Sequence, residues 1–175
     1  KMKRFFLLIM ILFAISFTIQ GETSEKFPVT KKNVDEFHFV YYEFTGPYQK
    51  AFEQFGAFMA YLKMSGIETG PYSVGIYLDN PQMTPPEKLR SELGFMVKKE
   101  VKTSGIYKYK KVDGFKAIST RYGSMNDIQG AWDALGKYLM KNGLIPAGPG
   151  YEFYKTGKDP SVISAECFFP VMETK

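Results

Sequence analysis

The sequence predicts an α+β fold built from two tandem copies of one unit, with one main helix per copy packed on an antiparallel sheet. Three observations predict it: strand-like and helix-like patterns alternate along the chain, the same order of patterns returns after 77 residues, and an aromatic strand follows each helix. Two copies are too few for a solenoid. We therefore expect one closed domain whose two βαββ-type copies are related by an approximate two-fold axis.

Residues 1–21 have the pattern of a signal peptide. Lys3 and Arg4 precede an apolar run over residues 5–19, and polar residues follow from Gln20. This run of 15 residues is shorter than the roughly 20 that a helix needs to cross a bilayer. We expect export to a periplasmic or extracellular location, with an uncleaved N-terminal membrane anchor as the alternative.

Much of the net positive charge of the chain comes from this leader. The sequence carries 23 basic and 18 acidic side chains, a formal charge of +5, and three of the basic ones are Lys1, Lys3 and Arg4. Without these three, 20 basic side chains face 18 acidic ones. That balance is too weak to argue for a polyanionic partner, so we expect no nucleic-acid partner and membrane contact only through the N-terminal segment.

The first copy is expected at about residues 37–103, after a polar linker over residues 22–36. The alternating run FHFVYYEFT at 37–45 predicts a strand, and Pro47 suits the first position of a helix. Apolar side chains recur at helical spacing up to Gly66, which fits the left-handed position after a helix: Tyr48, Phe52, Phe55, Met59 and Leu62. Further strands are expected at 72–78 and 93–99.

The second copy is expected at about residues 104–173 and repeats this order. Ser124, with Asp127 three residues later, resembles a capping box, and Gly143 fits the end of the helix. The apolar stripe of this helix consists of Ile128, Trp132, Leu135 and Leu139. The expected strands of this copy lie at 106–111, 117–122, 151–155 and 162–169.

Several short motifs follow one another along the chain: GlyProTyr at 46–48, GlyIleTyr at 75–77, AspAsnPro at 79–81, ArgTyrGly at 121–123 and GluPheTyr at 152–154. Taken in this order, they resemble the GyrI-like, AraC-type effector-binding domain family, whose fold is related to the SOUL and SHS2 folds. The resemblance covers residues 37–171. It implies a small-molecule-binding domain with a cleft between the copies, and it places the family's cleft glutamate, in a Glu-x-Tyr motif, on Glu152 with Tyr154.

The chemistry of this motif favours an organic cation as ligand. Side chains at positions i and i+2 share a face of a strand, so Glu152 and Tyr154 point the same way, and the 77-residue offset places Gly75 and Tyr77 opposite them. The missing side chain at Gly75 is expected to leave space for the ligand. A carboxylate is costly to bury unpaired, and a bound cation would offset that cost, with about 0.5–2 kcal/mol from each aromatic contact. The alternative is that Glu152 lies at the surface or pairs with Lys155.

Four further aromatic residues are candidate ligand contacts. Phe55 and Trp132 occupy equivalent positions in the two helices, where packing in the core is the alternative role. Tyr48 and Tyr122 lie where a strand meets a helix, and we expect them at the mouth of the cleft.

The residues offer little to bind a metal or cofactor. Cys167 is the only cysteine, and His38, the only histidine, has no evident acidic or serine partner. We therefore expect neither a metal nor a haem or other cofactor.

The sequence thus predicts an exported domain that captures a hydrophobic compound, neutral or cationic, in an aromatic cleft with a central glutamate. The alternative is an enzyme. Some members of the family that the chain resembles hydrolyse cyclopropanoid-type toxic compounds, and Glu152 would be the catalytic carboxylate of such a site.

Overall fold

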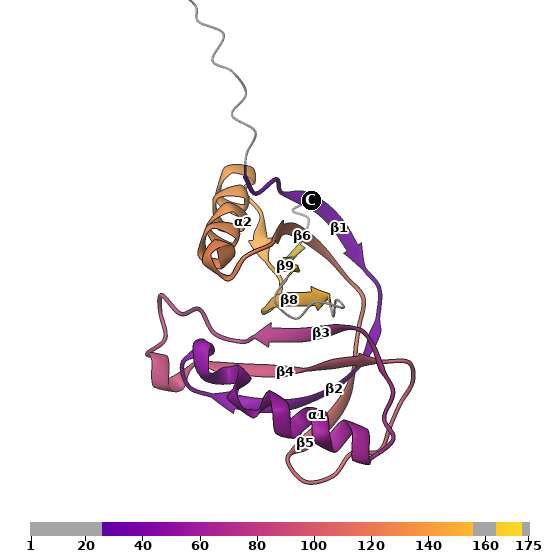
Figure 1. Cartoon of the computed structure of the whole chain (residues 1–175). Helices are drawn as coiled ribbons and strands as arrows, with labels where there is room; N and C mark the ends of the chain where they lie inside the picture. Colours follow the sequence, from indigo (N-terminus) through magenta and orange to yellow (C-terminus); the bar gives the residue numbers. More distant parts are fainter. Residues whose placement is uncertain (1–25, 156–163, 173–175) are drawn as a thin grey trace, which may run out of the picture.

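A computed structural model describes residues 26–155 and 164–172, and the expected leader at 1–21 lies outside this part of the chain (Figure 1). The strands are β1 (Thr30–Val34), β2 (Phe37–Thr45), β3 (Thr69–Tyr77), β4 (Arg90–Val97), β5 (Tyr107–Val112), β6 (Phe115–Tyr122), β7 (Ile145–Pro146), β8 (Gly150–Lys155) and β9 (Ala165–Met172). The helices are η1 (Tyr48–Gln54), α1 (Phe55–Met64), η2 (Pro86–Lys88), η3 (Met125–Asp127) and α2 (Ile128–Asn142), where η denotes a 3-10 helix.

The strands form one antiparallel sheet in the order β1-β6-β9-β8-β3-β4-β2-β5, with the short β7 paired to β9. This order divides into two matching halves that meet at the central pair β3–β8. In each half the strand before the long helix lies next to an outer strand, and the two strands after the helix lead toward the centre. The predicted α+β architecture, with two related copies and one main helix in each, is therefore the observed one.

The two halves exchange their outer strands, which differs from the sequence-based expectation. Residues 22–36 were expected to be a linker, but β1 lies within them and pairs with β6 of the second half. Conversely, β5 falls in the expected second copy and pairs with β2 of the first half. The reason is that only two residues separate β1 from β2, and two separate β5 from β6, so each pair of strands continues as one long ribbon from one half to the other.

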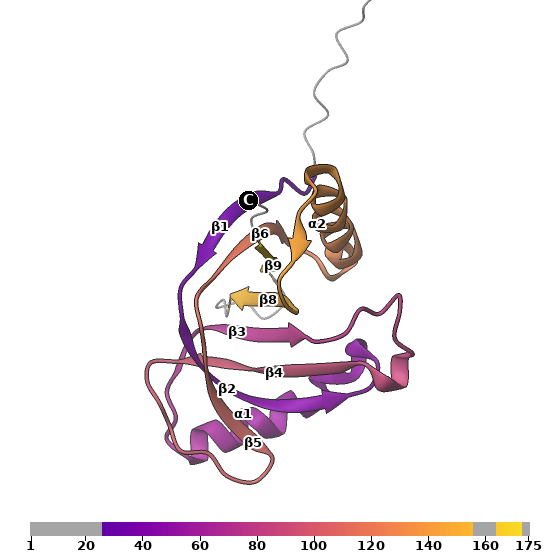
Figure 2. The same ribbon diagram turned by 180° about the vertical axis from the view of Figure 1, so that it is seen from behind.

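These two ribbons run side by side along one flank of the molecule (Figures 1 and 2). The pairing of Val34 with Phe115 and of Phe37 with Val112 belongs to a single register that continues through the junction. Gly114 lies at this junction, and a Cβ atom there would be 3.0 Å from the carbonyl oxygen of Val34. The close approach of the two backbones explains why a glycine occupies this position.

The helices cover one face of the sheet, and the opposite face holds an apolar core shared by both halves. Helix α1 buries Phe58 and Leu62 against the first half, and helix α2 buries Ala131, Leu135 and Leu139 against the second. The shared core on the opposite face includes Phe39, Val74, Ile76, Phe153 and Phe168. Each central strand thus alternates between a helix-covered side and the shared core.

The apolar face of the first helix differs from the expected one. Met59 was placed on the apolar face, but it is 44% exposed, and its neighbour Phe58 is the buried residue. The tighter 3-10 turns of η1 change the angular spacing of the side chains that follow, which explains the shift. Gly66 and Gly143 adopt the predicted left-handed conformation after α1 and α2, with φ of +65° and +61°. Within residues 26–155 and 164–172 no helix is long and apolar enough to cross a membrane.

Candidate functional site

The candidate site lies on the helix-covered face of the two central strands. In the β3–β8 pair Gly75 is opposite Glu152, Ser73 is opposite Tyr154, and Tyr77 is opposite Gly150. The hydroxyls of Tyr77 and Tyr154 meet at the carboxylate of Glu152, so these side chains share one face, as the spacing predicts.

Glu152 is buried, with 2% of its surface exposed, and it accepts hydrogen bonds on both oxygens. The Tyr77 hydroxyl donates to Oε2 at 2.7 Å, and the Trp132 indole N–H donates to Oε1 at 2.8 Å. The Tyr154 hydroxyl also donates to Oε2 and lies 2.9 Å from the Tyr77 hydroxyl. The alternative that placed Glu152 at the surface or paired it with Lys155 is wrong: no basic side chain in the described part of the chain forms an ion pair with it.

The neighbours of this carboxylate are therefore neutral donors. Burial, and then the negative charge of Glu152, raises the pKa of Tyr77 well above its usual range. Burial also raises the pKa of Tyr154 well above its usual range, with Tyr77 and Glu152 adding to the effect. Both hydroxyls consequently keep their protons and remain hydrogen-bond donors to Glu152.

Two glycines allow aromatic side chains to reach the carboxylate. A Cβ atom at Gly75 would lie 3.0 Å from the Tyr77 hydroxyl oxygen, so the space expected for a ligand over Gly75 is filled by the Tyr77 ring. A Cβ atom at Gly150 would lie 2.7 Å from the Trp132 ring. Because Gly75 and Gly150 have no side chains, the Tyr77 and Trp132 rings can pack directly on the strands and reach Glu152.

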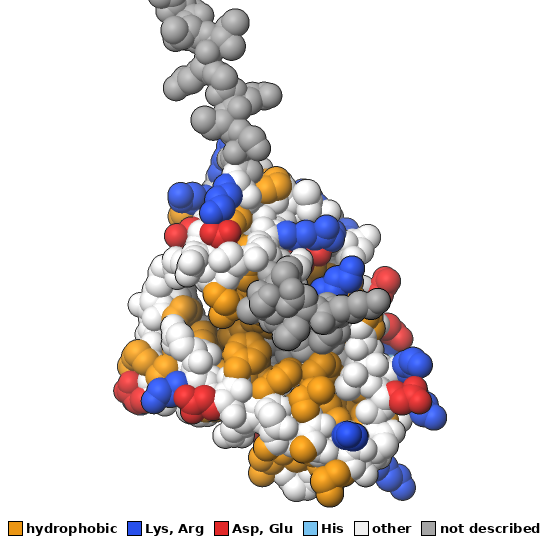
Figure 3. Space-filling model, in the orientation of Figure 1, with side chains coloured by type: hydrophobic (Ala, Val, Ile, Leu, Met, Phe, Trp, Pro, Cys, Tyr) orange, Lys and Arg blue, Asp and Glu red, His pale blue; other side chains and the backbone are white. Residues whose placement is uncertain are grey.

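Aromatic rings from both halves surround this cluster. The Tyr48 ring meets the Tyr77 ring edge-on at 4.8 Å, and the Phe52 ring meets the Tyr154 ring at 5.7 Å. On the other side Trp132 packs on Phe169 at 5.0 Å. Figure 3 shows hydrophobic side chains gathered in the middle of this face, in a recess between the part that carries α2 and the part that carries η1 and α1. The surface of this recess is therefore apolar.

Phe52 and Phe169 were not predicted as site residues. Phe52 belongs to the apolar stripe of the first helix, but it is 36% exposed because η1 turns it toward Tyr154 and away from the core. The helical spacing could not indicate this, since the 3-10 geometry of η1 changes which residues share a face.

Tyr48 fixes one border of the site. Its hydroxyl donates to the carbonyl of Asp79 at 2.8 Å and accepts the backbone N–H of Asp79 at 3.1 Å. The Asp79 carboxylate forms a two-pronged ion pair with Arg90, at 2.8 and 3.0 Å. The hydroxyl of Tyr48 is thus engaged with the backbone, and only its ring faces Tyr77.

Tyr122 lies elsewhere than expected, and Phe55 has the alternative role, packing beside the core. Tyr122 was expected at the cleft mouth but is 4% exposed and belongs to the core beneath α2. Its buried hydroxyl makes no well-formed hydrogen bond to the described residues, and burial, followed by the negative charge of Glu152, raises the pKa of Tyr122. Phe55 packs beside the core under α1, with its ring 5.2 Å from that of Phe95, and it does not contact Glu152.

The single histidine and cysteine have structural partners. His38 Nδ1 lies 2.6 Å from the Tyr109 hydroxyl, and the two rings are stacked. Cys167 is fully buried, and burial, with Glu152 nearby, raises the pKa of its thiol to about 12. Residues 26–155 and 164–172 contain no group of three His, Cys, Asp or Glu side chains arranged to hold a metal ion.

Comparison with known proteins identifies the family. A model described as the GyrI-like small molecule binding domain matches residues 27–172. No curated protein matches the chain in sequence.

Several solved structures share the fold at low sequence identity. The EcmrR C-terminal domain is 16% identical, with a TM-score of 0.75 over 85% of this chain and 99% of that one. The longer EcmrR chain in the EcmrR–DNA complex also matches, and 58% of it corresponds to this protein. A hydrolase from Listeria innocua is 14% identical, with a TM-score of 0.56 over 82% of this chain and 91% of that one. SAV2435 bound to tetraphenylphosphonium is 13% identical, with a TM-score of 0.54 over 83% of this chain and 94% of that one.

Proposed function

The chain belongs to the GyrI-like small-molecule-binding domain family, and from this premise we propose that it captures a hydrophobic organic cation, with Glu152 as the anionic contact. The observation that carries the proposal is the buried Glu152 carboxylate, which holds three neutral donors and no basic partner among the described residues.

The charge of Glu152 supports a cationic rather than a neutral ligand. Hydrogen bonds from neutral donors stabilise a buried carboxylate only in part, because they leave its net charge in a medium of low dielectric constant. An organic cation in the recess would supply the missing charge. It would also carry less hydration into the site than a compact ammonium ion, so its desolvation costs less.

The rings around Glu152 support the same class of ligand. Tyr77, Tyr154 and Trp132 present aromatic surface next to the carboxylate, and each contact of a cation with such a ring contributes about 0.5–2 kcal/mol. Tetraphenylphosphonium, the compound bound in the SAV2435 structure, has this combination of charge and aromatic surface. It is therefore a suitable probe for this chain.

Binding requires a local rearrangement. The Tyr77 and Tyr154 hydroxyls close over Glu152, so a ligand that approaches the carboxylate must move at least one of these rings. Phe52, on η1, packs edge-on against Tyr154 and is the exposed member of the cluster. We propose that the ligand enters beside Phe52.

The test is a titration of the purified domain with tetraphenylphosphonium, followed by the fluorescence of Trp132, the only tryptophan. Saturable quenching is expected because the indole donates to the carboxylate that the cation approaches. Glu152→Gln should weaken the response strongly, whereas Glu68→Gln, which alters a carboxylate that is 79% exposed, should leave it unchanged. Absence of saturation, or equal binding by Glu152→Gln, would refute the proposal.

A second candidate function is hydrolysis at the same carboxylate. The observation that favours it is the pair of tyrosine hydroxyls on one oxygen of Glu152, which could hold a water molecule for a general base. The Listeria innocua neighbour is described as a hydrolase. Multiple turnover of a cyclopropane-bearing substrate, abolished by Glu152→Gln, would favour this function over simple capture.

We also propose that the domain acts after export, since residues 1–21 have the pattern of a leader. Fractionation of cells that express the full chain tests this, and recovery in the cytoplasm alone would refute it. The expected lack of a nucleic-acid partner stays a prediction. The neighbour EcmrR occurs in a complex with DNA, and the region that matches this domain makes up 58% of the EcmrR chain.

A further inference from the structure

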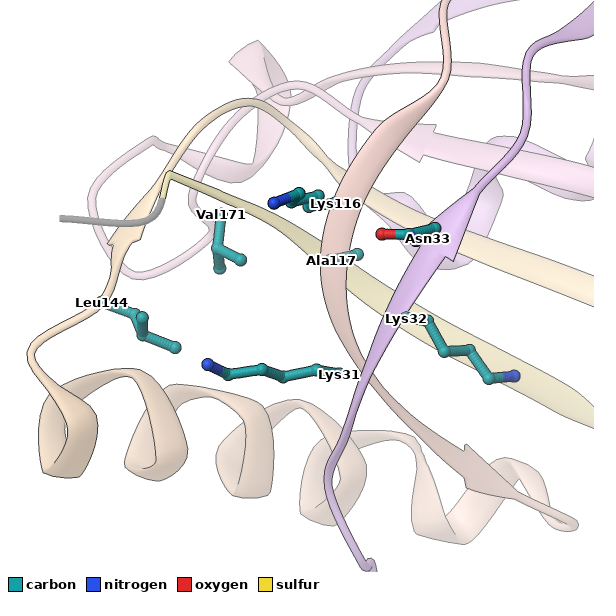
Figure 4. A pocket seen from close by; sticks show the side chains of 7 residues that line it. All are labelled: Lys31, Lys32, Asn33, Lys116, Ala117, Leu144 and Val171. Atoms are coloured by element: carbon teal, nitrogen blue, oxygen red, sulfur yellow. The ribbon is translucent and has the colours of Figure 1, made fainter. Parts of the chain in front are cut away.

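A second hollow lies in the second half of the molecule. It has a volume of about 310 Å³ and is lined by Lys31, Lys32, Asn33, Lys116, Ala117, Leu144 and Val171 (Figure 4). It shares no residue with the aromatic cluster around Glu152. Its size is at the low end of the range for small-molecule sites, roughly 300–1,000 Å³.

The hollow lies beside the end of β9. One edge of β9 pairs with β6 as far as Pro170, opposite Ala117, and on the other edge the last residues, Val171 and Met172, pair with β7. Val171 and Leu144 provide the apolar wall of the hollow (Figure 4).

The polar lining of this hollow is basic. Three lysines and an asparagine line it, and no acidic side chain does. Lys32 points away from the other lysines and pairs with Glu166 at 2.5 Å, so its charge is neutralised on the other side of β1 (Figure 4). Lys31 extends toward Leu144, and Lys116 extends toward the side of Val171 (Figure 4).

Lys31 and Asn33 hold unused hydrogen-bonding capacity. Among the residues that the structure describes, neither side chain makes a hydrogen bond or an ion pair. They lie on the same face of β1, two residues apart, and Asn33 is paired across the ladder with Lys116. An ammonium and an amide on one face of a strand can bind an anionic group.

We propose that this hollow is a second binding site, which takes a small organic anion with an apolar body, such as an aromatic sulfonate or carboxylate. Lys31 binds the anionic group together with the amide of Asn33, and the apolar body lies against Leu144 and Val171. The site thus has the opposite charge preference to that of the aromatic cluster around Glu152. The two sites are independent, so this inference does not require the proposed function.

The test is an NMR titration of the labelled domain with 1-anilinonaphthalene-8-sulfonate, followed through backbone amide signals. Saturable shifts are expected at Asn33, Ala117 and Leu144, with smaller changes at Gly75 and Glu152. The variant Lys31→Gln should bind about tenfold more weakly, because it loses the charged contact to the anionic group. Lys102→Gln, an exposed lysine outside the hollow, is the matched control and should bind like the original chain.

The outcomes separate the two sites. If the probe shifts only amides near Glu152, or if Lys31→Gln binds it as well as the control, the second site is refuted. No saturable shift at millimolar probe also refutes it. Glu152→Gln should leave the shifts at Asn33 and Leu144 unchanged, so a failure of the proposed cation site would not alter this result.

Discussion

Gly75 lies directly opposite Glu152 in the β3–β8 pair, and the ring of Tyr77 occupies the place that a side chain at position 75 would take. The two halves of the molecule thus contribute different residues at equivalent positions. The second half provides the carboxylate. The first half provides a glycine, and the Tyr77 ring lies over it so that its hydroxyl reaches the carboxylate. A single carboxylate results at this pair, where two identical halves would place two carboxylates side by side.

Gly75→Ala should disrupt this arrangement. The added methyl group would lie 3.0 Å from the Tyr77 hydroxyl and 3.2 Å from its ring, so Tyr77 must move away from Glu152. We expect the free energy of unfolding to fall by about 1–3 kcal/mol, the usual cost of overpacking together with a weakened hydrogen bond. Thermal denaturation measures it.

The matched control is Gly56→Ala, on the exposed side of α1, where an added Cβ meets nothing within 4 Å. This variant should be stabilised by about 0.5–1 kcal/mol, because alanine favours a helix over glycine. If both alanine variants were equally stable, the close contact between Gly75 and Tyr77 would not matter energetically.

Trp132→Phe should cost more than the loss of aromatic packing alone. The variant removes the 2.8 Å hydrogen bond to Glu152, and bonds to charged groups contribute about 1.5–3 kcal/mol. We expect unfolding in urea, followed by circular dichroism, to show a loss of about 2–4 kcal/mol, which includes the space left against Gly150.

A double-mutant cycle with Glu152→Gln measures the coupling between the indole and the charge of the carboxylate. The two changes should be coupled by about 1 kcal/mol or more, because one removes the donor and the other removes the charge of its acceptor. Strictly additive effects would show that the indole and the carboxylate do not interact in solution.

Cys167 should be inert in the folded domain. Burial raises the pKa of its thiol to about 12, so almost no thiolate is present at neutral pH, and the side chain is fully buried. Iodoacetamide should therefore alkylate it only after unfolding, as mass spectrometry will show. Rapid alkylation of the native domain would contradict this placement.

The stability of the domain should decrease in acid partly through Glu166. Burial alone would raise the pKa of this carboxyl, but hydrogen bonds from Lys32, Ser119 and Arg121 lower it below the ordinary value of 4.5. A carboxyl whose pKa is lower in the folded state contributes stability above the unfolded value. That contribution disappears as the pH falls from 4.5 through the folded pKa.

Glu166→Gln should consequently destabilise the domain at neutral pH and have less effect in acid, as urea unfolding across this range will show. Glu68→Gln is the control, since Glu68 forms an exposed pair with Lys98 at 3.2 Å that contributes little. A stability difference between Glu166→Gln and the original chain that does not vary with pH would refute the role of the lowered pKa.

Sequence reasoning predicted the parts of this fold that depend on local patterns. Alternation predicted the central strands, and the 77-residue repeat predicted that Gly75 faces Glu152. The glycines after both helices were also predicted, because their left-handed backbone favours that residue.

The remaining features depend on contacts that a local pattern does not contain. The exchange of β1 and β5 arises from two-residue junctions that let each strand continue into the opposite half. The position of Phe52 depends on η1 being a 3-10 helix, and Tyr122 is buried because α2 covers it. A polar segment such as TKKNV, at residues 30–34, has no clear strand alternation and becomes a strand through its pairing with β6.

The most direct test of the central claim is calorimetric titration with tetraphenylphosphonium and with the neutral triphenylphosphine oxide. The original chain should prefer the cation by about tenfold or more, since a buried carboxylate and aromatic faces both attract positive charge. Glu152→Gln, once circular dichroism shows that it is folded, should lose this preference and still bind the neutral compound. An undiminished preference for the cation in folded Glu152→Gln would contradict the account.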